Sequence, residues 1–444
     1  MPLSGDYRID ALLQADLHRW NHQEAMGTPA VVPYAFMDTL PAYYAGIPAS
    51  HIQPDMVSYN LVVIDEAHRA LVREEIRQIE AAIPGLKFFE TTNPDAAVIR
   101  IGAYQPTATV PSAGQYDASG QSPNDATLPS PLQSGDIWFN TSSQKYDLAR
   151  TYMGYTVQPT QFADMALHEL GHAIGFKHPG NYSGGAMASD IPPWLPANED
   201  DSVHTVMSYN GDYAGPEFRP YDILAGRFLY GSTAGTSWVL AADGNPVIEG
   251  SALNERIALG GGHHAVNAGS GVDVAVYSDN RAQHAVTKTA TAWTVSGSGG
   301  TDTLENVERL VFSDANIALD IAAGNAGTTA KILGAVFGAA SVSNTAYVGI
   351  GLGYLDNGMS YQDLMLLALN ARLGAGFSDT DEVNLLYQNL AGSPPSATDL
   401  SYWTGKLASG QYSQASLAVM AADLDLNATN INLAGLAQVG IEFA

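Results

Sequence analysis

The sequence predicts an α+β protein with a mixed domain, a small β module and a C-terminal helical bundle, and three observations support this. Residues 11–231 mix strand and helix patterns and hold most of the histidines and aromatic residues. Residues 260–320 combine glycine-rich turns with short alternating apolar runs, which are typical of short strands. From residue 323 onward, segments rich in Ala and Leu recur at helical spacing. A chain of 444 residues accommodates two or three domains, which we place at 1–245, 246–322 and 323–444.

The first domain is predicted to begin with a strand and a long helix. Val31–Phe36 contains β-branched and aromatic residues before a turn and predicts the strand. Ser58–Ile83 carries apolar residues at helical spacing and predicts one long amphipathic helix. Gln105–Ser134 is rich in Pro, Ser, Gly and Gln and predicts an extended loop or edge region, and a long loop in a compact domain is more often functional than idle. Three further short strands are predicted at Lys87–Glu90, Ala97–Gly102 and Asp136–Asn140.

The rest of the chain is predicted as short strands followed by helices. Alternating apolar runs at Val274–Tyr277 and Leu310–Phe312 predict strands of the β module. The helical segments are separated by Gly, Pro and Asn, as in a compact bundle. They are predicted at Asp363–Leu373, Thr380–Leu390, Ala397–Ser409 and Ser413–Leu424.

Composition and charge exclude several classes of function. The chain holds 19 Lys and Arg against 45 Asp and Glu, a formal net charge of −26, which repels phosphate backbones and disfavours nucleic-acid binding. It has no cysteine, which excludes disulfides, zinc–thiolate sites, iron–sulfur clusters and thiol nucleophiles. No stretch approaches the roughly 18 to 20 apolar residues that span a bilayer, so we expect no membrane span. Residues 1–21 lack the apolar core of a secretory signal.

The segment HELGHAIGFKH, from His168 to His178, carries most of the chemical information. His168 and His172 are four residues apart, so on a helix both imidazoles project from one face and can bind one cation. Gly175 permits a left-handed turn that ends the helix, and the chain can then return to supply His178 as a third ligand. Glu169 lies beside that face, where its carboxylate can reach a metal-bound water without being a ligand.

Three neutral imidazoles with an open fourth position are typical of a catalytic zinc site rather than a closed structural one. Zinc lowers the pKa of its bound water to roughly 7 and polarises a peptide carbonyl. Glu169 would take the proton from this water and pass it toward the leaving amine. The alternative is a surface helix that happens to carry histidines, and it gives no common reason for the three His, the Glu and the Gly.

This segment resembles the extended zinc signature of the metzincin metalloproteases, and its continuation resembles the serralysin branch of that family. The resemblance covers roughly the first half of the chain. It implies a metzincin-like domain, with a twisted mixed sheet and long helices, and a cleft in which an extended peptide adds to the edge strand of the sheet. The segments that are similar to the serralysin branch are Asp10–Leu13, Trp20, Asp136–Asn140, His178–Tyr182 and Tyr221–Gly231.

The segment Thr205–Tyr209 (TVMSY) resembles the Met-turn of the same family. This resemblance implies that Met207 lies under the zinc as an apolar floor. It also implies that Tyr209 is a movable additional zinc ligand, whose phenol would stabilise the oxyanion of the tetrahedral intermediate. Taken alone, the two residues are equally well explained by core packing, and their distance downstream of the zinc helix favours the functional interpretation.

Typical serralysins carry tandem glycine-rich nonapeptides that wind into a calcium-binding β-roll. This chain offers one degenerate version at Gly269–Val274, and the cluster Gly297–Asp302 lacks the full period. Because a coiled stack needs several adjacent repeats, we do not expect a calcium array. Glycine-rich turns are favoured over a calcium site at Asp273 or Asp302, and Ca²⁺ stays open with few sites at most.

The C-terminal region resembles segments of exported proteins. From Ala323 onward it is similar to a helical domain of unknown function on secreted bacterial and surface-layer-associated proteins, and residues 302–314 are similar to the linker that often precedes it. The end Ile441–Ala444 resembles a type I secretion tail, with an ordinary frayed terminus as the alternative. We expect a secreted, extracellular protein. Because only about ten residues precede the segment that resembles the mature start, latency would come from an inhibitor protein or from delayed metal loading.

The sequence therefore predicts a monomeric, secreted zinc endopeptidase that acts on proteins and peptides. Its metal ligands would be His168, His172 and His178, with Glu169 as base and Tyr209 as oxyanion donor. One alternative is a surface-associated binding protein in which the protease fold is a scaffold and the helical tail is the working part. The intact three-histidine motif argues against it. A narrower alternative is a protease restricted to one surface-layer or adhesin substrate.

Overall fold

The computed structural model describes residues 4–14, 18–22, 24–46, 60–106, 118–123, 128, 133–148, 151–152, 155–156, 159–182, 192–211, 215–233, 235, 237–238 and 247–444. The chain divides into two compact units, residues 1–249 with 256–258 and residues 250–255 with 259–444. The three-domain division at 245 and 322 stays a prediction. None of the described helices is long and apolar enough to cross a membrane.

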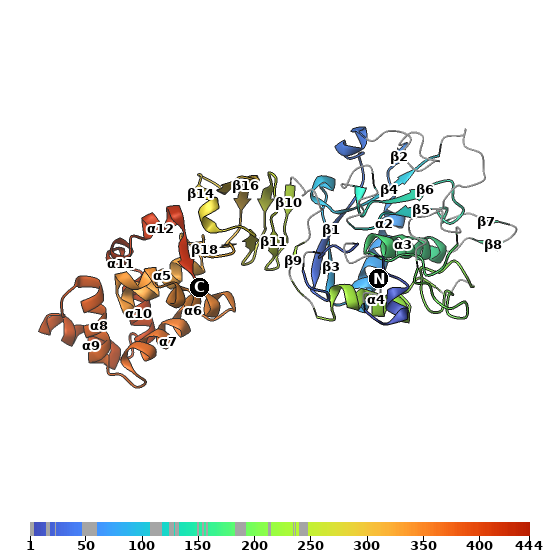
Figure 1. Ribbon diagram of the computed structural model, residues 1–444. Helices are drawn as coiled ribbons and strands as arrows, with labels where there is room; N and C mark the ends of the chain where they lie inside the picture. Colours follow the sequence, from blue (N-terminus) through green and yellow to red (C-terminus); the bar gives the residue numbers. More distant parts are fainter. Residues whose placement is uncertain are drawn as a thin grey trace. The chain divides into compact units, whose positions relative to one another are not determined.

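The first unit contains a mixed sheet with β1 (Ala30–Phe36) inside it (Figure 1). The other strands are β2 Leu61–Val62, β3 Leu86–Glu90, β4 Ile99–Tyr104, β5 Ala118–Gly120, β6 Ile137–Asn140, β9 Ser237–Trp238 and β11 Arg256–Ala258. They follow the order β11-β9-β1-β4-β6-β5, with β3 beside β1 and β2 beside β4. β1 pairs in parallel with β3, β4 and β9, whereas β5 pairs antiparallel with β6 at the end of this order. A separate antiparallel pair is formed by β7 (Thr151–Tyr152) and β8 (Tyr155–Thr156).

Helices cover this sheet and enclose the core of the first unit. The long ones, α2 (Glu66–Ala82) and α3 (Pro159–Ala173), pack against each other, and α1 (Tyr7–Asp10) packs against α4 (Pro220–Tyr230). The spacing of Val72, Ile76 and Ile79 places one apolar face of α2 in the core, as the 3.6-residue period requires. The core joins the sheet to the buried face of α3, which is the helix that carries His168 and His172.

The long helix begins later than predicted. Asp65 caps it, because its carboxylate accepts a hydrogen bond from the backbone N–H of His68 at 3.0 Å. Leu61 and Val62 lie upstream of this cap and form β2, while Ser58 and Tyr59 are outside the described residues. The apolar spacing in the sequence runs on through Leu61 and Val62, but the helix itself begins only after Asp65.

The predicted strands at Val31, Lys87, Ala97 and Asp136 are confirmed as β1, β3, β4 and β6, with ends shifted by up to two residues. Within the segment Gln105–Ser134, predicted as an extended loop or edge region, Ala118–Gly120 form β5, the last strand of the sheet order. This strand has no apolar pattern and is held by backbone pairing with β6, so no periodic signal marks it in the sequence. Much of the remaining predicted loop lies outside the described residues.

The β module has a nine-residue period that the sequence analysis missed. Strands β10 (Val247–Glu249), β11, β12 (Ala265–Asn267) and β13 (Val274–Val276) begin at residues 247, 256, 265 and 274. Their middle residues Ile248, Ile257, Val266 and Ala275 are all buried. One buried apolar residue carries this period, and the glycines that mark the usual nonapeptide do not, so the expectation of a single degenerate glycine-rich repeat is not contradicted.

In the second unit, successive strands enter two different sheets, as in a coil. β12 pairs in parallel with β16 (Gly300–Glu305), and β13 pairs in parallel with β17 (Arg309–Val311). An antiparallel hairpin of β14 (Ala285–Lys288) and β15 (Trp293–Gly297) lies between them in the sequence. Asp302 accepts hydrogen bonds from the His264 ring and from Tyr277. The preference for glycine-rich turns over a calcium ion at Asp302 or Asp273 stays a prediction.

The helices of the second unit confirm the predicted bundle (Figure 1). Serine residues before four of them accept a hydrogen bond from the third helical residue, which explains why these boundaries were predictable: Ser360, Ser378, Ser396 and Ser413. The helices are α5 Asn325–Phe337, α6 Thr345–Asp356, α7 Tyr361–Leu373, α8 Asp379–Ala391, α9 Ala397–Ala408, α10 Gln414–Ala422, α11 Asp425–Asn430 and α12 Leu433–Val439.

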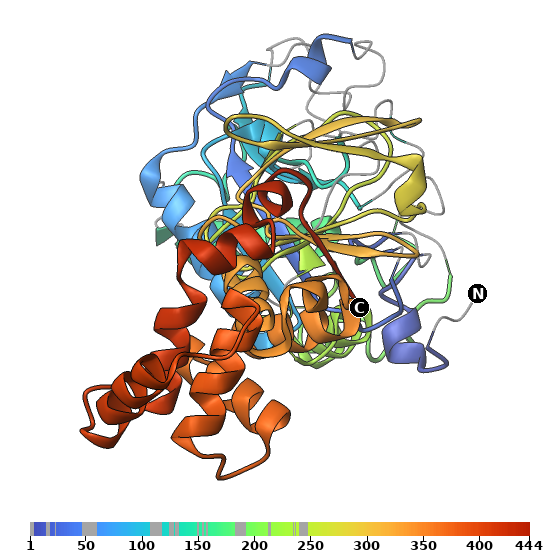
Figure 2. The same cartoon turned by 90° about the vertical axis from the view of Figure 1, so that its left-hand side faces the viewer.

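The C-terminal residues are paired rather than frayed. Ile441–Phe443 form β19, antiparallel to β18 (Asn316–Ala318), and the backbone N–H of Ala444 donates to the carbonyl of Thr345 at 3.0 Å. Figure 2 shows this terminus against the first helices of the bundle. The alternative of an ordinary frayed end is therefore wrong, and a role of this end in secretion stays a prediction.

Glu382 on α8 makes the stability of the second unit depend on pH. Its carboxylate is fully buried, neither oxygen has a hydrogen-bond partner among the described residues, and burial raises its pKa to about 8. Since the folded state then holds a proton that the unfolded state loses near pH 4.5, we expect the free energy of unfolding to fall as the pH rises from about 4.5 to 8. Glu382→Gln should match the wild type at pH 4.5 and be more stable by a few kcal/mol at pH 8, measured by scanning calorimetry. Parallel pH profiles of the two proteins would contradict this assignment.

Candidate metal centre

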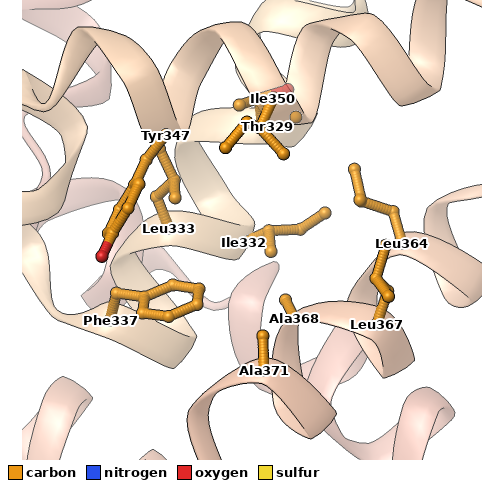
Figure 3. A pocket seen from close by; sticks show the side chains of 11 residues that line it. Thr329, Ile332, Leu333, Phe337, Tyr347, Ile350, Leu364, Leu367, Ala368 and Ala371 are labelled. Atoms are coloured by element: carbon orange, nitrogen blue, oxygen red, sulfur yellow. The ribbon is translucent and has the colours of Figure 1, made fainter.

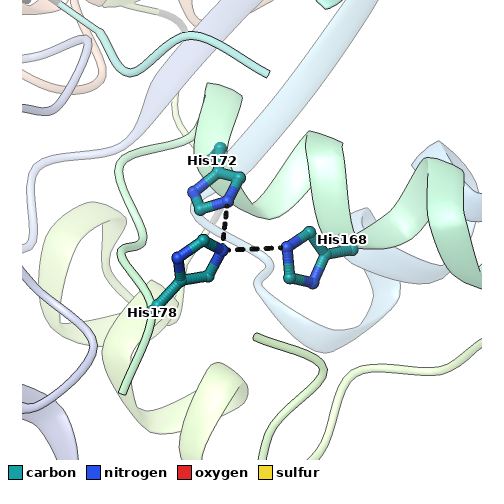
Figure 4. Close-up of side chains that lie close together, drawn as sticks. All are labelled: His168, His172 and His178. Atoms are coloured by element: carbon teal, nitrogen blue, oxygen red, sulfur yellow. Dashed lines mark hydrogen bonds between the residues drawn. The ribbon is translucent and has the colours of Figure 1, made fainter. Parts of the chain in front are cut away.

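The zinc-like segment has the local structure that its sequence predicts. Helix α3 carries His168 and His172 one turn apart and ends at Ala173. Gly175 has a φ of +109°, and a β-carbon there would lie 2.1 Å from the carbonyl oxygen of His18. Only glycine fits this turn, because both the backbone conformation and the close approach exclude a side chain. The turn brings His178 back toward the helix (Figure 4).

The three imidazoles converge on one point. The Nε2 atom of His178 lies 3.3 Å from that of His168 and 3.1 Å from that of His172. A tetrahedral ion with zinc–nitrogen bonds of about 2.0–2.1 Å separates neighbouring nitrogens by roughly 3.3 Å. The spacing of these atoms therefore fits a shared zinc ion. In the described part of the chain, this is the only group of three or more His, Asp or Glu close enough to hold a metal.

Two backbone carbonyls fix the ring orientation. The Nδ1 atom of His168 lies 2.8 Å from the Val206 carbonyl oxygen, and that of His172 lies 2.9 Å from the Phe176 carbonyl oxygen. A carbonyl only accepts hydrogen bonds, so each Nδ1 carries the proton and each Nε2 presents a lone pair to the centre. Such outer contacts set the tautomer and the direction of metal-binding histidines.

The surroundings keep all three rings neutral. Burial lowers the pKa of His172 to about 4, and burial together with the charges of His172 and Lys177 lowers that of His178 to about 2. Burial and the two neighbouring imidazoles lower the pKa of His168 well below its usual value. Neutral imidazole is the form that binds a metal ion.

Met207 lies under the helix that carries the first two histidines. It is 0% exposed, and a β-carbon on Gly171 would lie 2.6 Å from its sulfur. Gly171 therefore leaves the space that Met207 fills. The residue before Met207 is Val206, whose carbonyl oxygen faces His168, so the turn that holds the methionine also orients a candidate ligand.

Asp222 on α4 holds this turn in place. Its buried carboxylate accepts hydrogen bonds from the Thr205 hydroxyl at 2.5 Å, the Val206 backbone at 2.9 Å and the Arg219 backbone at 2.8 Å. Burial raises its pKa to about 6, although these donors lower it. Asp222 thus ties the first turn of α4 to the segment around Met207.

Replacing Asp222 with Ala is expected to destabilise the first unit by about 2–4 kcal/mol, because two buried backbone N–H groups lose their acceptor. Urea unfolding would measure the change. Asp38→Ala is a matched control on the surface of the same unit, where the aspartate pairs with the Arg69 side chain and a change within about 1 kcal/mol is expected. Equal effects of the two substitutions would contradict the role given to Asp222.

Tyr209 lies at the open side of the three histidines. It is 57% exposed, and its ring centre is 4.5 Å from that of His178 and 5.5 Å from that of His168. Tyr182 stacks on the Tyr209 ring at 4.8 Å, lies 5.8 Å from the ring centre of His178 and donates its hydroxyl hydrogen bond to Asp200. The Tyr209 ring therefore packs against His168, His178 and Tyr182, and Asp200 holds Tyr182 in place.

Glu169 is buried on α3, next to His168 in the sequence. Strand β5 approaches the helix at this residue, because a β-carbon on Gly120 would lie 2.5 Å from the Glu169 carbonyl oxygen. The last strand in the sheet order thus runs directly beside the helix that carries the candidate ligands.

Comparisons with known proteins agree with this geometry. Residues 49–193 match the matrixin family of M10 peptidases. Serralysin G of Dickeya chrysanthemi is 27% identical over 235 residues, which cover 49% of this chain and 42% of that protein. The serralysins of Photorhabdus laumondii and Proteus mirabilis are each 26% identical, covering 47% and 49% of this chain and 38% and 43% of those proteins. The N-terminal half of the chain is thus similar to the serralysin-type metzincins.

The metzincin domain belongs, at the level of the family, to the zinc metalloproteases. The match spans less than half the length of the curated relatives. Of the residues predicted from the sequence, the structure brings His168, His172 and His178 to one point and packs Tyr209 against His168 and His178. Met207 lies against Gly171 of α3 and Glu169 is buried on the same helix, and the roles of all six residues stay predictions. Sequence analysis missed the residues that hold them in place, above all Asp222 and Asp200. A carboxylate at the third position of a helix that starts with proline was the available signal for Asp222.

Lys177 is another supporting residue in the metzincin domain that the sequence did not reveal. It is fully buried, and its ammonium group donates to the carbonyl oxygens of Ala11 at 2.5 Å and Pro193 at 2.9 Å. Its backbone N–H donates to Leu12 at 2.8 Å. These bonds connect the N-terminal segment to the residue just before His178.

Proposed function

We propose that the chain is a zinc-dependent endopeptidase in which His168, His172 and His178 hold the metal. The convergence of three neutral imidazole Nε2 atoms, two of them oriented by carbonyl contacts, carries this proposal. Zinc held by three histidines supplies a water of lowered pKa and a Lewis acid for the scissile carbonyl.

Glu169 and Tyr209 are the side chains proposed to act directly on the water and the substrate. The Glu169 carboxylate accepts a proton from the attacking water and delivers it to the leaving nitrogen. The Tyr209 hydroxyl donates a hydrogen bond to the oxyanion of the tetrahedral intermediate, and its exposed ring has room to move toward the substrate. Met207 has no chemical role and forms the apolar floor below the histidines.

Strand β5 supports the proposal that extended peptides are the substrates. It is the last strand of the described sheet order and lies beside α3 at Glu169. A peptide that pairs with its outer edge gains backbone hydrogen bonds, which do not depend on sequence, and runs past the three histidines. We therefore expect broad rather than sharp cleavage preference.

Secretion is part of the same proposal. Export by a type I route to the extracellular space would place a broad protease away from the proteins of the producing cell, and an inhibitor protein or delayed zinc loading would protect that cell before export. Detection of the full chain in culture medium of a strain with an intact type I exporter, and its retention in an exporter mutant, would support this route.

Metal removal tests the proposed activity. The full chain should hydrolyse casein, lose this activity nearly completely after dialysis against 1,10-phenanthroline, and recover it when zinc alone is added back, because the rest of the site is preformed. Magnesium serves as the control ion and should restore nothing, since it prefers oxygen ligands. Casein hydrolysis that persists without metal, or a zinc-loaded chain without proteolysis, would refute the proposal and favour the scaffold alternative.

A further inference from the structure

One carboxylate holds the chain on both sides of Tyr209. Asp200 is 9% exposed, and its Oδ1 atom accepts hydrogen bonds from the Ser208 hydroxyl at 2.7 Å and from the Tyr182 hydroxyl. Its Oδ2 atom accepts a hydrogen bond from the side-chain amide of Asn210 at 2.9 Å. Ser208 and Asn210 are the two chain neighbours of Tyr209, so a single buried side chain restrains Tyr209 from both directions.

Further hydrogen bonds fix the backbone around Tyr209. The Ser208 hydroxyl oxygen accepts from the Asn210 backbone N–H at 3.1 Å and from the Tyr182 hydroxyl at 3.1 Å. The backbone N–H of Ser202 donates to the Asn210 carbonyl at 3.0 Å. Hydrogen bonds to a carboxylate are stronger than those between neutral groups, so these contacts together give residues 208–210 a defined position.

Tyr182 supports the Tyr209 ring itself. The two ring planes are inclined by 29°, which is a stacked arrangement. Gly180 leaves the space in which Tyr182 meets Asp200, because a β-carbon at residue 180 would lie 2.5 Å from both the Asp200 Oδ2 atom and the Tyr182 ring. The ring that supports Tyr209 is therefore held by the same carboxylate that holds the chain neighbours of Tyr209.

The two buried aspartates of this region act on different parts of one turn. Asp222 holds the backbone before Met207, where the Val206 carbonyl orients a candidate metal ligand. Asp200 holds the residues after Met207, which flank Tyr209. The metal ligands and the Tyr209 phenol are thus supported by separate carboxylates.

We propose that Asp200 and Tyr182 are positioning residues that keep the Tyr209 ring at the open side of the three histidines. Tyr209 is 57% exposed, and without this support its side chain would populate several rotamers. The catalytic consequence rests on the proposed function. A hydrogen-bond donor that is already in place adds more to the rate than one that the reaction must first order.

Fluorine NMR of the metal-free full chain, with 3-fluorotyrosine at position 209 only, tests this placement without relying on activity. The wild-type signal should be displaced from that of free fluorotyrosine, because the rings of His178 and Tyr182 lie beside the label. Tyr182→Leu removes the stacked ring and Asp200→Ala releases both chain neighbours, so each variant should move the signal toward the free value. Tyr182→Phe keeps the stacked ring and should keep most of the displacement.

Tyr347→Leu is the matched control, because it also removes a solvent-accessible tyrosine that packs on a neighbouring ring. Tyr347 belongs to the helical bundle, where its ring centre lies 5.4 Å from that of Phe337 (Figure 3). This variant should leave the signal of the label unchanged. An unchanged signal in both Tyr182→Leu and Asp200→Ala overturns the proposal, whether or not the chain is a protease.

Peptide cleavage at saturating zinc tests the catalytic consequence. Tyr182→Leu should lower kcat about tenfold, and Tyr182→Phe should keep kcat within about threefold of the wild type. In a Tyr209→Phe background, Tyr182→Leu should cause no further loss, because no phenol is left to position. An equal loss in both backgrounds shows general damage to the site and overturns the proposal. A zinc-loaded wild type that cleaves nothing refutes the proposed function instead, and the fluorine signals then decide the placement alone.

Discussion

Replacement of Glu169 by Gln is expected to abolish proteolysis while zinc stays bound. Glutamine has the same shape but cannot accept a proton from water, so kcat/KM on a peptide substrate should fall about 100- to 10,000-fold. The backbone carbonyls of Val206 and Phe176 orient His168 and His172, and glutamine keeps the size of glutamate, so the metal site itself should be unchanged. Zinc content by atomic absorption and peptide cleavage by fluorescence, on the same preparation, measure the two results.

The matched control is Glu217→Gln, which removes an acidic charge from the same unit at an exposed position beside Arg219. It should keep both the zinc and the activity. Near-normal cleavage by the Glu169 variant would show that another group takes the proton. Loss of zinc from that variant would instead show that Glu169 supports the metal site, which the geometry does not predict.

The candidate ligands could be predicted because they are local in the sequence. His168, His172 and His178 lie within eleven residues, and helix periodicity plus one glycine turn decide where their side chains go. The positive φ at Gly175 is the physical reason why the third histidine returns to the first two. The resemblance to a known family added Met207 and Tyr209, which local rules alone could not place.

The supporting residues could not be predicted, because their partners are distant in the sequence. Asp222 acts on the backbone of Val206, and the buried ammonium group of Lys177 acts on Ala11. Each of these residues has a polar side chain that sequence patterns assign to the surface. Only the fold shows that the polar atom meets buried backbone groups.

Two features of the fold could not be placed from the sequence, for the same kind of reason. Strand β5 has the sequence Ala-Ser-Gly and is specified by pairing with β6 rather than by its own pattern. The short strands around Ile257 and Val266 share only one buried apolar residue in every nine. This pattern is too weak to be recognised in the sequence without knowing which strands pair. By contrast, the helices after residue 360 were predictable because serine caps mark their starts.

Replacement of His178 by Ala is expected to remove zinc from the chain and with it the proteolysis. His178 is the point where the ligand atoms meet, since its Nε2 lies 3.1–3.3 Å from the Nε2 atoms of both other histidines. Two imidazoles one helical turn apart still bind a metal, but far more weakly, and the affinity should fall by more than the roughly 10- to 100-fold that loss of an outer contact costs. Competition with a fluorescent zinc chelator measures this affinity directly.

His204→Ala separates this effect from the mere loss of a histidine. His204 lies three residues before Met207, where its ring contacts Asp201 and the ring of Tyr221 rather than the metal centre. Its removal should leave zinc affinity unchanged and lower stability only slightly, because its ion pair is partly exposed. If the His178 and His204 variants bound zinc equally well, the third ligand would have to come from elsewhere.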